Sequence, residues 1–169
     1  MRPRRALFTE NLRDGYAGKF RAQLAARNAI DPARCAAMYG VLRDNGAWVT
    51  PTMVLELVDS SALRSPSFAL LRSDARQFCT GTVTAIAAAP DSLRRAYYDR
   101  FRQDIATLHA NGVGLLAGTD LGNPCVAAGS SLHDELAELV RAGLTPLAAL
   151  ATATVNPAIE RETFLSAFF

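Results

Sequence analysis

Long apolar runs, paired histidines and clustered lysines are missing from this sequence. No stretch reaches the 18 or more apolar residues of a transmembrane helix, so we expect no membrane span. Lys19 is the only lysine, and a net charge of +2 without a further basic cluster argues against nucleic-acid binding. The basic start Met1–Arg5 leads into no apolar signal core, so we expect a cytoplasmic location.

Cysteine is scarce, and its spacing forms no framework. Cys35, Cys79 and Cys125 are odd in number and far apart, and none belongs to a Cys-x-x-Cys pair. This pattern indicates neither a zinc knuckle nor a disulfide scaffold. We therefore expect buried, reduced thiols.

The composition is that of a globular protein, with 50% apolar and 20% charged residues among 169. Two segments share one pattern, in which a helix, an Asn-Gly pair and a short apolar strand follow one another. Asp31-Pro32 begins the first helix, and Asn45-Gly46 ends it before a strand near 47–51. Its inward residues should be Cys35, Met38 or Tyr39, and Leu42.

The second such segment begins at Asp91 and ends at Asn111-Gly112, before a strand near 113–117. Its apolar stripe recurs at helical spacing and consists of Leu93, Tyr97, Phe101, Ile105 and Leu108. Two successive units of this kind predict neighbouring parallel strands in a mostly helical α/β fold.

Further helices are indicated along the chain. Residues 7–29 have helical spacing, and Ser67 could cap a helix that carries Phe68, Leu71, Ala75 and Phe78. The secondary structure of Thr82–Ala89 is ambiguous, because β-branched residues come first and alanines last. Ser130 or Ser131 could cap a helix that ends near Gly143, with Ser131-x-x-Asp134 as a capping box, and Thr145-Pro146 begins another helix.

Asp120 follows the second predicted strand directly, at the strand end where α/β folds gather their chemistry. A carboxylate there can act as a general base, or it can bond its own backbone as a turn residue. His133, in the first turn of the next helix, could contact a substrate, or it could face solvent or pack as a structural residue. Both alternatives remain open from the residues alone.

The stretch from Gly112 to Pro157 resembles a known family. Its segments Gly-Val-Gly-Leu-Leu-Ala-Gly-Thr-Asp-Leu-Gly, Ser-Leu-His-Asp-Glu-Leu and Ala-Thr-Val-Asn-Pro-Ala are similar to the carboxyl-terminal part of the barrel in metal-dependent amidohydrolases. The group around imidazolonepropionases and dipeptidase-like or prolidase-like enzymes is the most similar. The resemblance is strongest over 112–158.

The resemblance implies a partial (β/α)8 barrel over residues 1–169, with the two strands as the seventh and eighth. Gly-Ala-Trp-Val-Thr-Pro-Thr before Met53 resembles the family's seventh-strand segment. Residues 54–90 would be a helical insertion, and 159–169 a divergent tail. The implied activity is hydrolysis of C–N bonds in a small amide, cyclic amide or peptide-like substrate by a metal-activated water. Asp120 would be a metal ligand and general base, His133 a substrate contact, and zinc the expected metal.

The family's other metal ligands have no counterpart in this sequence. They are a His-x-His pair, a Lys or Glu after the fourth strand, and one His each after the fifth and sixth. The chain has two histidines, and Lys19 falls in a helical stretch. We therefore expect this chain alone to be inactive, to bind no metal tightly, and to self-associate or require an amino-terminal barrel half. The alternative is a non-catalytic remnant or pseudoenzyme that serves as an interaction module.

Overall fold

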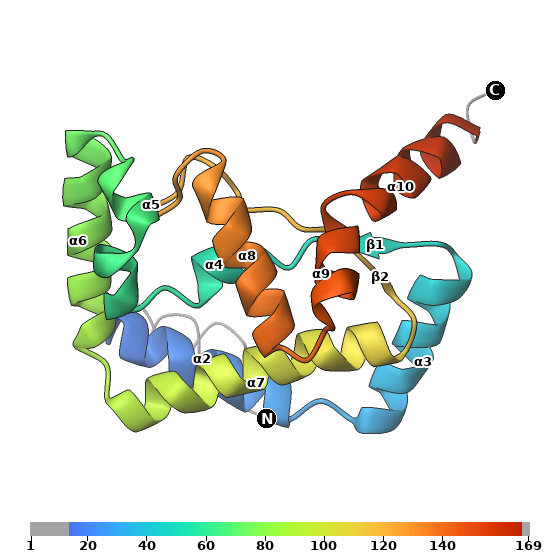
Figure 1. The fold of residues 1–169 in the computed structure, drawn as a ribbon. Coiled ribbons are helices and arrows are strands. Elements are labelled where there is room, and N and C mark those ends of the chain that lie inside the picture. The colour runs from blue at the N-terminus through green and yellow to red at the C-terminus, as the bar shows by residue number, and fades with distance from the viewer. Residues whose placement is uncertain (1–13, 167–169) are drawn as a thin grey trace.

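The computed structural model describes residues 14–166, and it describes side chains up to residue 160. The elements are α2 (Gly15–Asn28), α3 (Pro32–Asp44), β1 (Trp48–Val49), α4 (Met53–Glu56), the 3-10 helix η1 (Ser60–Arg64), α5 (Pro66–Ala69), α6 (Ser73–Ala87), α7 (Asp91–Ala110), β2 (Gly114–Leu115), α8 (Ser130–Arg141), α9 (Pro146–Thr152) and α10 (Val155–Ser166). Helices dominate the structure, and a small sheet lies near α3, α9 and the carboxyl end of α7 (Figure 1).

The predicted parallel strands are confirmed, although both are shorter than expected. Trp48 lies opposite Gly114, and Val49 opposite Leu115, in a parallel pair. Gly114 leaves room for the Trp48 ring, since a Cβ there would lie 2.5 Å from Cε3 of Trp48. The mostly helical α/β prediction therefore holds. A sheet of two strands does not close on itself, so the described residues form no barrel.

The two edges of this sheet differ. The outer edge of β2 is covered, because Ala117 N–H donates to the Thr152 carbonyl at 3.0 Å and Asn156 Nδ2 to the Leu115 carbonyl at 2.9 Å. Val49 accepts a bond from Leu116, so the backbone groups of Trp48 point to the opposite side. Among the described residues, none outside the sheet hydrogen-bonds to that edge of β1.

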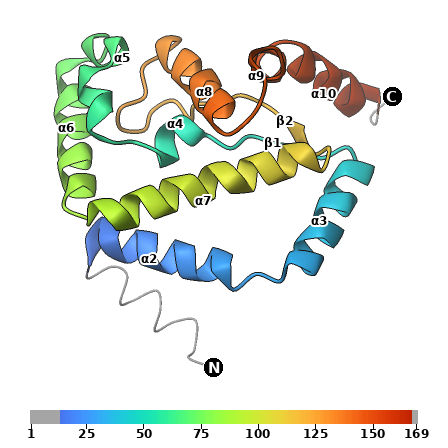
Figure 2. The same ribbon diagram turned by 60° about the horizontal axis from the view of Figure 1, so that its bottom comes forward.

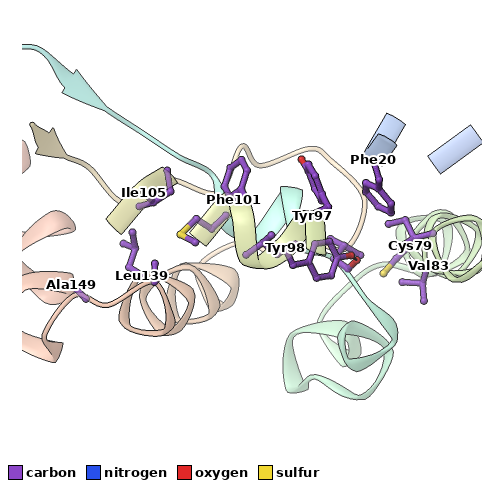
Figure 3. Close-up of a cluster of buried hydrophobic side chains, with 14 of the residues drawn as sticks. Phe20, Cys79, Val83, Tyr97, Tyr98, Phe101, Ile105, Leu139 and Ala149 are labelled. Carbon is purple, nitrogen blue, oxygen red and sulfur yellow. Dashed lines mark hydrogen bonds between the residues drawn. The ribbon is translucent and has the colours of Figure 1, made fainter. Parts of the chain in front are cut away.

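Helix α7 forms the centre of the core, and α2 runs along it (Figure 2). The predicted stripe is confirmed, with Tyr97, Phe101 and Ile105 buried. The ring of Phe20 stacks on Tyr97 with centroids 4.7 Å apart (Figure 3). The Arg27 guanidinium lies 5.2 Å from the centre of the Phe101 ring. The predicted start of α2 at residue 7 lies outside the described residues.

Helix α3 begins and ends as predicted but packs differently. The Asp31 carboxylate accepts from Ala33 N–H at 2.9 Å, and Gly46 follows the helix with a φ of 62°. None of its side chains is fully buried. Of the two alternatives Met38 and Tyr39, Tyr39 is the one that lies inward: it is half-buried together with Cys35 and Leu42. Met38 and Val41 are exposed.

The helix predicted from Ser67 through Phe78 was also wrong. Ser65 caps α5 instead, its hydroxyl accepting from Ser67 N–H at 3.2 Å ahead of Pro66. The chain then turns Leu71 into the core before α6 begins, and Phe78 is left exposed. Ser65-Pro66 begins a helix of its own, and the apolar residues from Phe68 to Phe78 are divided between α5, the turn after it and α6. The ambiguous stretch from Thr82 proved helical up to Ala87.

The capping box predicted for α8 was wrong as well. Gly129 occupies the N-cap position, and both serines have partners elsewhere. Ser131 Oγ accepts from Ala127 N–H at 2.8 Å, and Ser130 Oγ lies 2.7 Å from Ser67 Oγ. Both serine hydroxyls thus bond residues outside α8 instead of capping the helix as the sequence pattern predicted. The Thr145 cap of α9 is confirmed, with a bond of 3.2 Å from Ala148 N–H.

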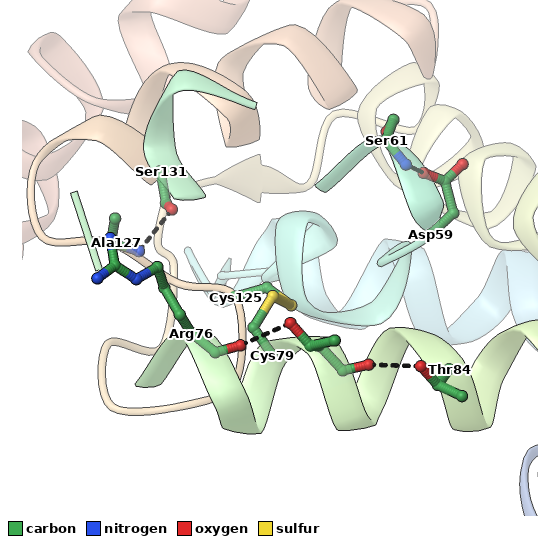
Figure 4. Close-up of a disulfide and its surroundings, with 9 residues drawn as sticks. Asp59, Ser61, Arg76, Cys79, Thr84, Cys125, Ala127 and Ser131 are labelled. Carbon is green, nitrogen blue, oxygen red and sulfur yellow. Dashed lines mark hydrogen bonds between the residues drawn. A yellow bond between two sulfur atoms is a disulfide. The ribbon is translucent and has the colours of Figure 1, made fainter. Parts of the chain in front are cut away.

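The expectation of reduced thiols was wrong for two of the three cysteines. Cys79 on α6 and Cys125 in the loop after β2 form a disulfide with a sulfur–sulfur distance of 2.05 Å (Figure 4). Only the fold brings together residues 46 positions apart. Cys35 is free and half-buried. The predicted cytoplasmic location stays a prediction. No helix in the described part of the chain is long and apolar enough to cross a membrane.

Candidate functional site at the carboxyl ends of the strands

The turns that follow β1 and β2 share an unusual backbone feature. Thr52 after β1 has a φ of 48°, and Asp120 after β2 has a φ of 52°. Non-glycine residues in the left-handed region are costly and concentrate at functional sites. Gly118 lets the two turns approach, because a Cβ there would lie 2.4 Å from Cγ2 of Thr50. Backbone strain and close packing therefore coincide at one end of the sheet.

Asp120 is exposed, and its carboxylate is uncommitted. The turn is held by the Asp120 backbone carbonyl, which accepts from Asn123 N–H at 3.4 Å and from Asn123 Nδ2 at 3.0 Å. No described residue donates a hydrogen bond to the Asp120 side chain or pairs with it as an ion. The turn is thus held by the Asp120 backbone and not, as the alternative prediction had it, by a bond from the Asp120 carboxylate to its own turn. The side chain is available to an external ligand.

His133 lies in the first turn of α8 and is also exposed. No hydrogen bond or ion pair links it to Asp120 or to any other described residue. The structure therefore leaves both predicted site residues open to solvent without joining them. The role of His133 as a substrate contact stays a prediction.

Glu135 is the residue that sequence reasoning missed. It is fully buried on α8, and its Oε2 accepts from Val54 N–H at 2.7 Å, while no described residue bonds Oε1. Burial raises the pKa of Glu135 to about 7, against the lowering effect of the N–H groups of Val54 and Met53. Glu135 thereby ties α8 to the turn after β1. The only signal in the sequence was a carboxylate next to an apolar stripe, which ordinarily marks a solvated helix face.

Two cavities flank these turns. The first, about 160 Å³, lies between η1 and α8, and some of its polar groups are paired. There Ser67 Oγ donates to Asp134 Oδ2 at 2.7 Å, and Glu138 pairs with Arg141 and, at 3.0 Å, with Arg102.

The second cavity, about 230 Å³, is lined by residues of α2, α4, α6 and the loop after β2. It shares Asn123 with the Asp120 turn. The connections that follow both strands contribute to it, through Glu56 from the β1 side and Asn123 from the β2 side. The first cavity is also lined from both connections, through Val54 and Cys125.

The described residues do not make a metal centre. They contain no group of three or more His, Cys, Asp or Glu side chains that could hold a metal ion. Catalytic zinc usually takes three protein ligands, so Asp120 by itself does not make a zinc centre. Comparison with protein-family models, curated proteins and solved structures finds no match for this chain. The amidohydrolase resemblance therefore rests on the sequence motifs.

Proposed function

We propose that this chain forms the carboxyl-terminal strand–helix units of a metal-dependent amidohydrolase-type catalytic domain, which hydrolyses C–N bonds in small amides or peptide-like molecules. The observation that carries the proposal is the parallel pairing of β1 and β2 with Asp120 exposed in the turn that follows β2. The free edge of β1 further supports a place for additional strands, on a longer polypeptide or a second chain.

In the complete domain Asp120 would serve as metal ligand and general base. Amide hydrolysis at a metal requires a proton acceptor beside the activated water, and an uncommitted carboxylate suits that task. His133 would contact the substrate. This chain by itself is proposed to lack a finished metal centre and to be inactive.

The proposal is tested by looking for the missing units and restoring them. Genomic DNA flanking the reading frame should encode further strand–helix units with a His-x-His pair. Co-expression of that segment with this chain should yield a zinc-dependent amidase. Asp120→Asn should then reduce kcat by about 10²–10⁴-fold, and His133→Asn should mainly raise KM. Asp91→Asn, a surface change at the start of α7, serves as the control. Near-normal kcat in Asp120→Asn with unchanged zinc content would remove Asp120 from the mechanism.

A non-catalytic interaction module is the second candidate. Helices α9 and α10 expose Leu147, Leu150 and Val155, an apolar surface of the kind that proteins bury against partners. Flanking DNA that encodes no further barrel unit, together with failure to bind zinc, would favour this function.

A further inference from the structure

The cavity beside the Asp120 turn has an apolar wall inside the core. Phe20, Val58 and Ile86 line it, and each is at most 5% exposed. These side chains come from α2, from the segment after α4 and from α6. At about 230 Å³ the cavity is smaller than the pockets of about 300–1,000 Å³ that hold drug-sized ligands. It suits a small molecule that carries one aliphatic group.

An ion pair lies at the polar side of the same cavity. Lys19 Nζ lies 3.1 Å from Glu56 Oε2, and the two side chains are 39% and 28% exposed. Tyr97, itself fully buried, donates its hydroxyl to the same Oε2 at 2.7 Å. Tyr97 and Lys19 therefore hold the Glu56 carboxylate in place, while the Lys19 ammonium keeps two further N–H donors for a ligand.

Several polar atoms of this cavity remain unused. Glu56 Oε1, Asn123 Oδ1 and the Thr82 hydroxyl have no hydrogen-bond partner among the residues that the structure describes, and all three residues line the cavity. Glu56, Thr82 and Asn123 are half-buried, so these atoms are accessible to a ligand. They line the same cavity as the Lys19 ammonium, which the ion pair with Glu56 holds in place.

We infer that this cavity binds a free α-amino acid with an aliphatic side chain, such as leucine. Its carboxylate would pair with the Lys19 ammonium, and its ammonium group with Glu56 Oε1 and Asn123 Oδ1. Its side chain would contact Phe20, Val58 and Ile86. A zwitterion can place a charge of opposite sign beside each member of the Lys19–Glu56 pair, whereas a singly charged ligand can do so for only one of them.

This inference goes beyond the proposed hydrolase function, because it requires neither a metal nor the missing strands. Leucine binding can therefore fail while zinc-dependent activity of a completed domain succeeds, and the reverse. Leucine binding is measured on this chain alone and zinc-dependent activity on the completed domain, so a failure of one is distinguishable from a failure of the other.

Lys19 offers a site-specific probe because it is the only lysine. The chain is produced with ¹³C,¹⁵N-lysine, so that one side chain gives all the labelled signals. Titration with L-leucine should shift the Lys19 ε-CH₂ signal in a saturable manner. Leucinamide, which lacks the carboxylate, and 4-methylpentanoate, which lacks the amino group, should each bind at least tenfold more weakly. Glycine, which lacks the aliphatic group, should do the same.

A pair of variants tests the assigned contacts. Glu56→Gln keeps an acceptor for Tyr97 but removes the charge, and it should weaken leucine binding at least tenfold. Asp91→Asn, which breaks the exposed pair with Arg94 on α7, should leave binding unchanged. Thermal unfolding shows whether each variant is folded, and the ligand series on the unmodified chain decides the question if Glu56→Gln is not. An absent Lys19 shift, or equal responses to leucine, leucinamide and 4-methylpentanoate, would overturn the inference.

Discussion

The α3–β1 and α7–β2 units are built from the same local signals yet pack in opposite ways. In both, the asparagine after the helix donates its side-chain amide to the carbonyl four residues earlier, at 2.8 Å: Asn45 to Val41 and Asn111 to Thr107. In both, a glycine with positive φ, Gly46 or Gly112, then leads into the strand. Helix α7 nevertheless lies in the core, whereas α3 has no fully buried side chain.

The difference follows from the side chains that each helix carries inward. Helix α7 places Tyr97, Phe101 and Ile105 on one face, where α2 and α8 cover them. On α3 the half-buried positions are Cys35, Tyr39 and Leu42, among many small alanines. Capping and termination are thus set within a few residues, while burial depends on what the rest of the chain supplies as a partner.

Removing a large side chain from each helix should show the greatest contrast. Phe101→Ala on α7 should lower the free energy of unfolding by about 3–5 kcal/mol, because it leaves a cavity in the aromatic cluster. Met38→Ala on α3 should change it by less than about 0.5 kcal/mol. Urea denaturation measures both. Similar losses in the two variants would show that α3 has a buried partner after all.

The disulfide fixes the loop after β2, and no such bond holds α3. Reduction of Cys79–Cys125 should cost about 4 kcal/mol, the chain-entropy value for a separation of 46 residues. Unfolding is compared with and without a dithiol reductant. The double variant Cys79→Ala, Cys125→Ala should have lost that sensitivity, and Cys35→Ala should retain it. Unchanged stability on reduction would contradict the assignment.

Glu135 binds the start of α4, just after β1, and its titration should make the stability of the fold pH-dependent. Its pKa is raised from 4.5 to about 7 in the folded state, so the folded protein binds the proton more tightly than the unfolded chain. Stability should then fall as the pH rises from about 4.5 to about 7, by about 3 kcal/mol in all.

Glu135→Gln should flatten this dependence and raise stability above pH 7, since no buried charge forms. Asp74→Asn, at an exposed carboxylate, is the control and should keep the parent profile. An undiminished pH slope in Glu135→Gln, measured by unfolding from pH 4.5 to pH 8, would assign the dependence to another group.

Two glycine substitutions give the smallest effects, with opposite signs. Gly114→Ala in β2 would drive a Cβ into the Trp48 ring, and should cost about 1–3 kcal/mol. Gly40→Ala in α3 meets no atom within 4 Å and should gain about 0.5–1 kcal/mol. Fluorescence of Trp48, the only tryptophan, reports any displacement at the strand pair. Equal effects at both positions would contradict the close approach of the strands.

The sequence by itself determined the features that depend on a few neighbouring residues. Asp31-Pro32 and Thr145-Pro146 begin helices because a side-chain acceptor and a fixed φ act within one turn. The Asn-Gly pairs end helices for a similar reason, and the apolar spacing on α7 predicted the stripe that the core uses. The parallel strands followed from repetition of that unit.

The tertiary structure alone decided the features that join distant residues. The spacing of Cys79 and Cys125 does not predict their disulfide, and Ser131 Oγ accepts from Ala127 N–H instead of capping α8. The bond of Glu135 to Val54 and the pairing of Lys19 with Glu56 likewise join segments that are 81 and 37 residues apart in the sequence. Such contacts depend on the three-dimensional path of the chain, and a one-dimensional pattern carries no distance between its parts.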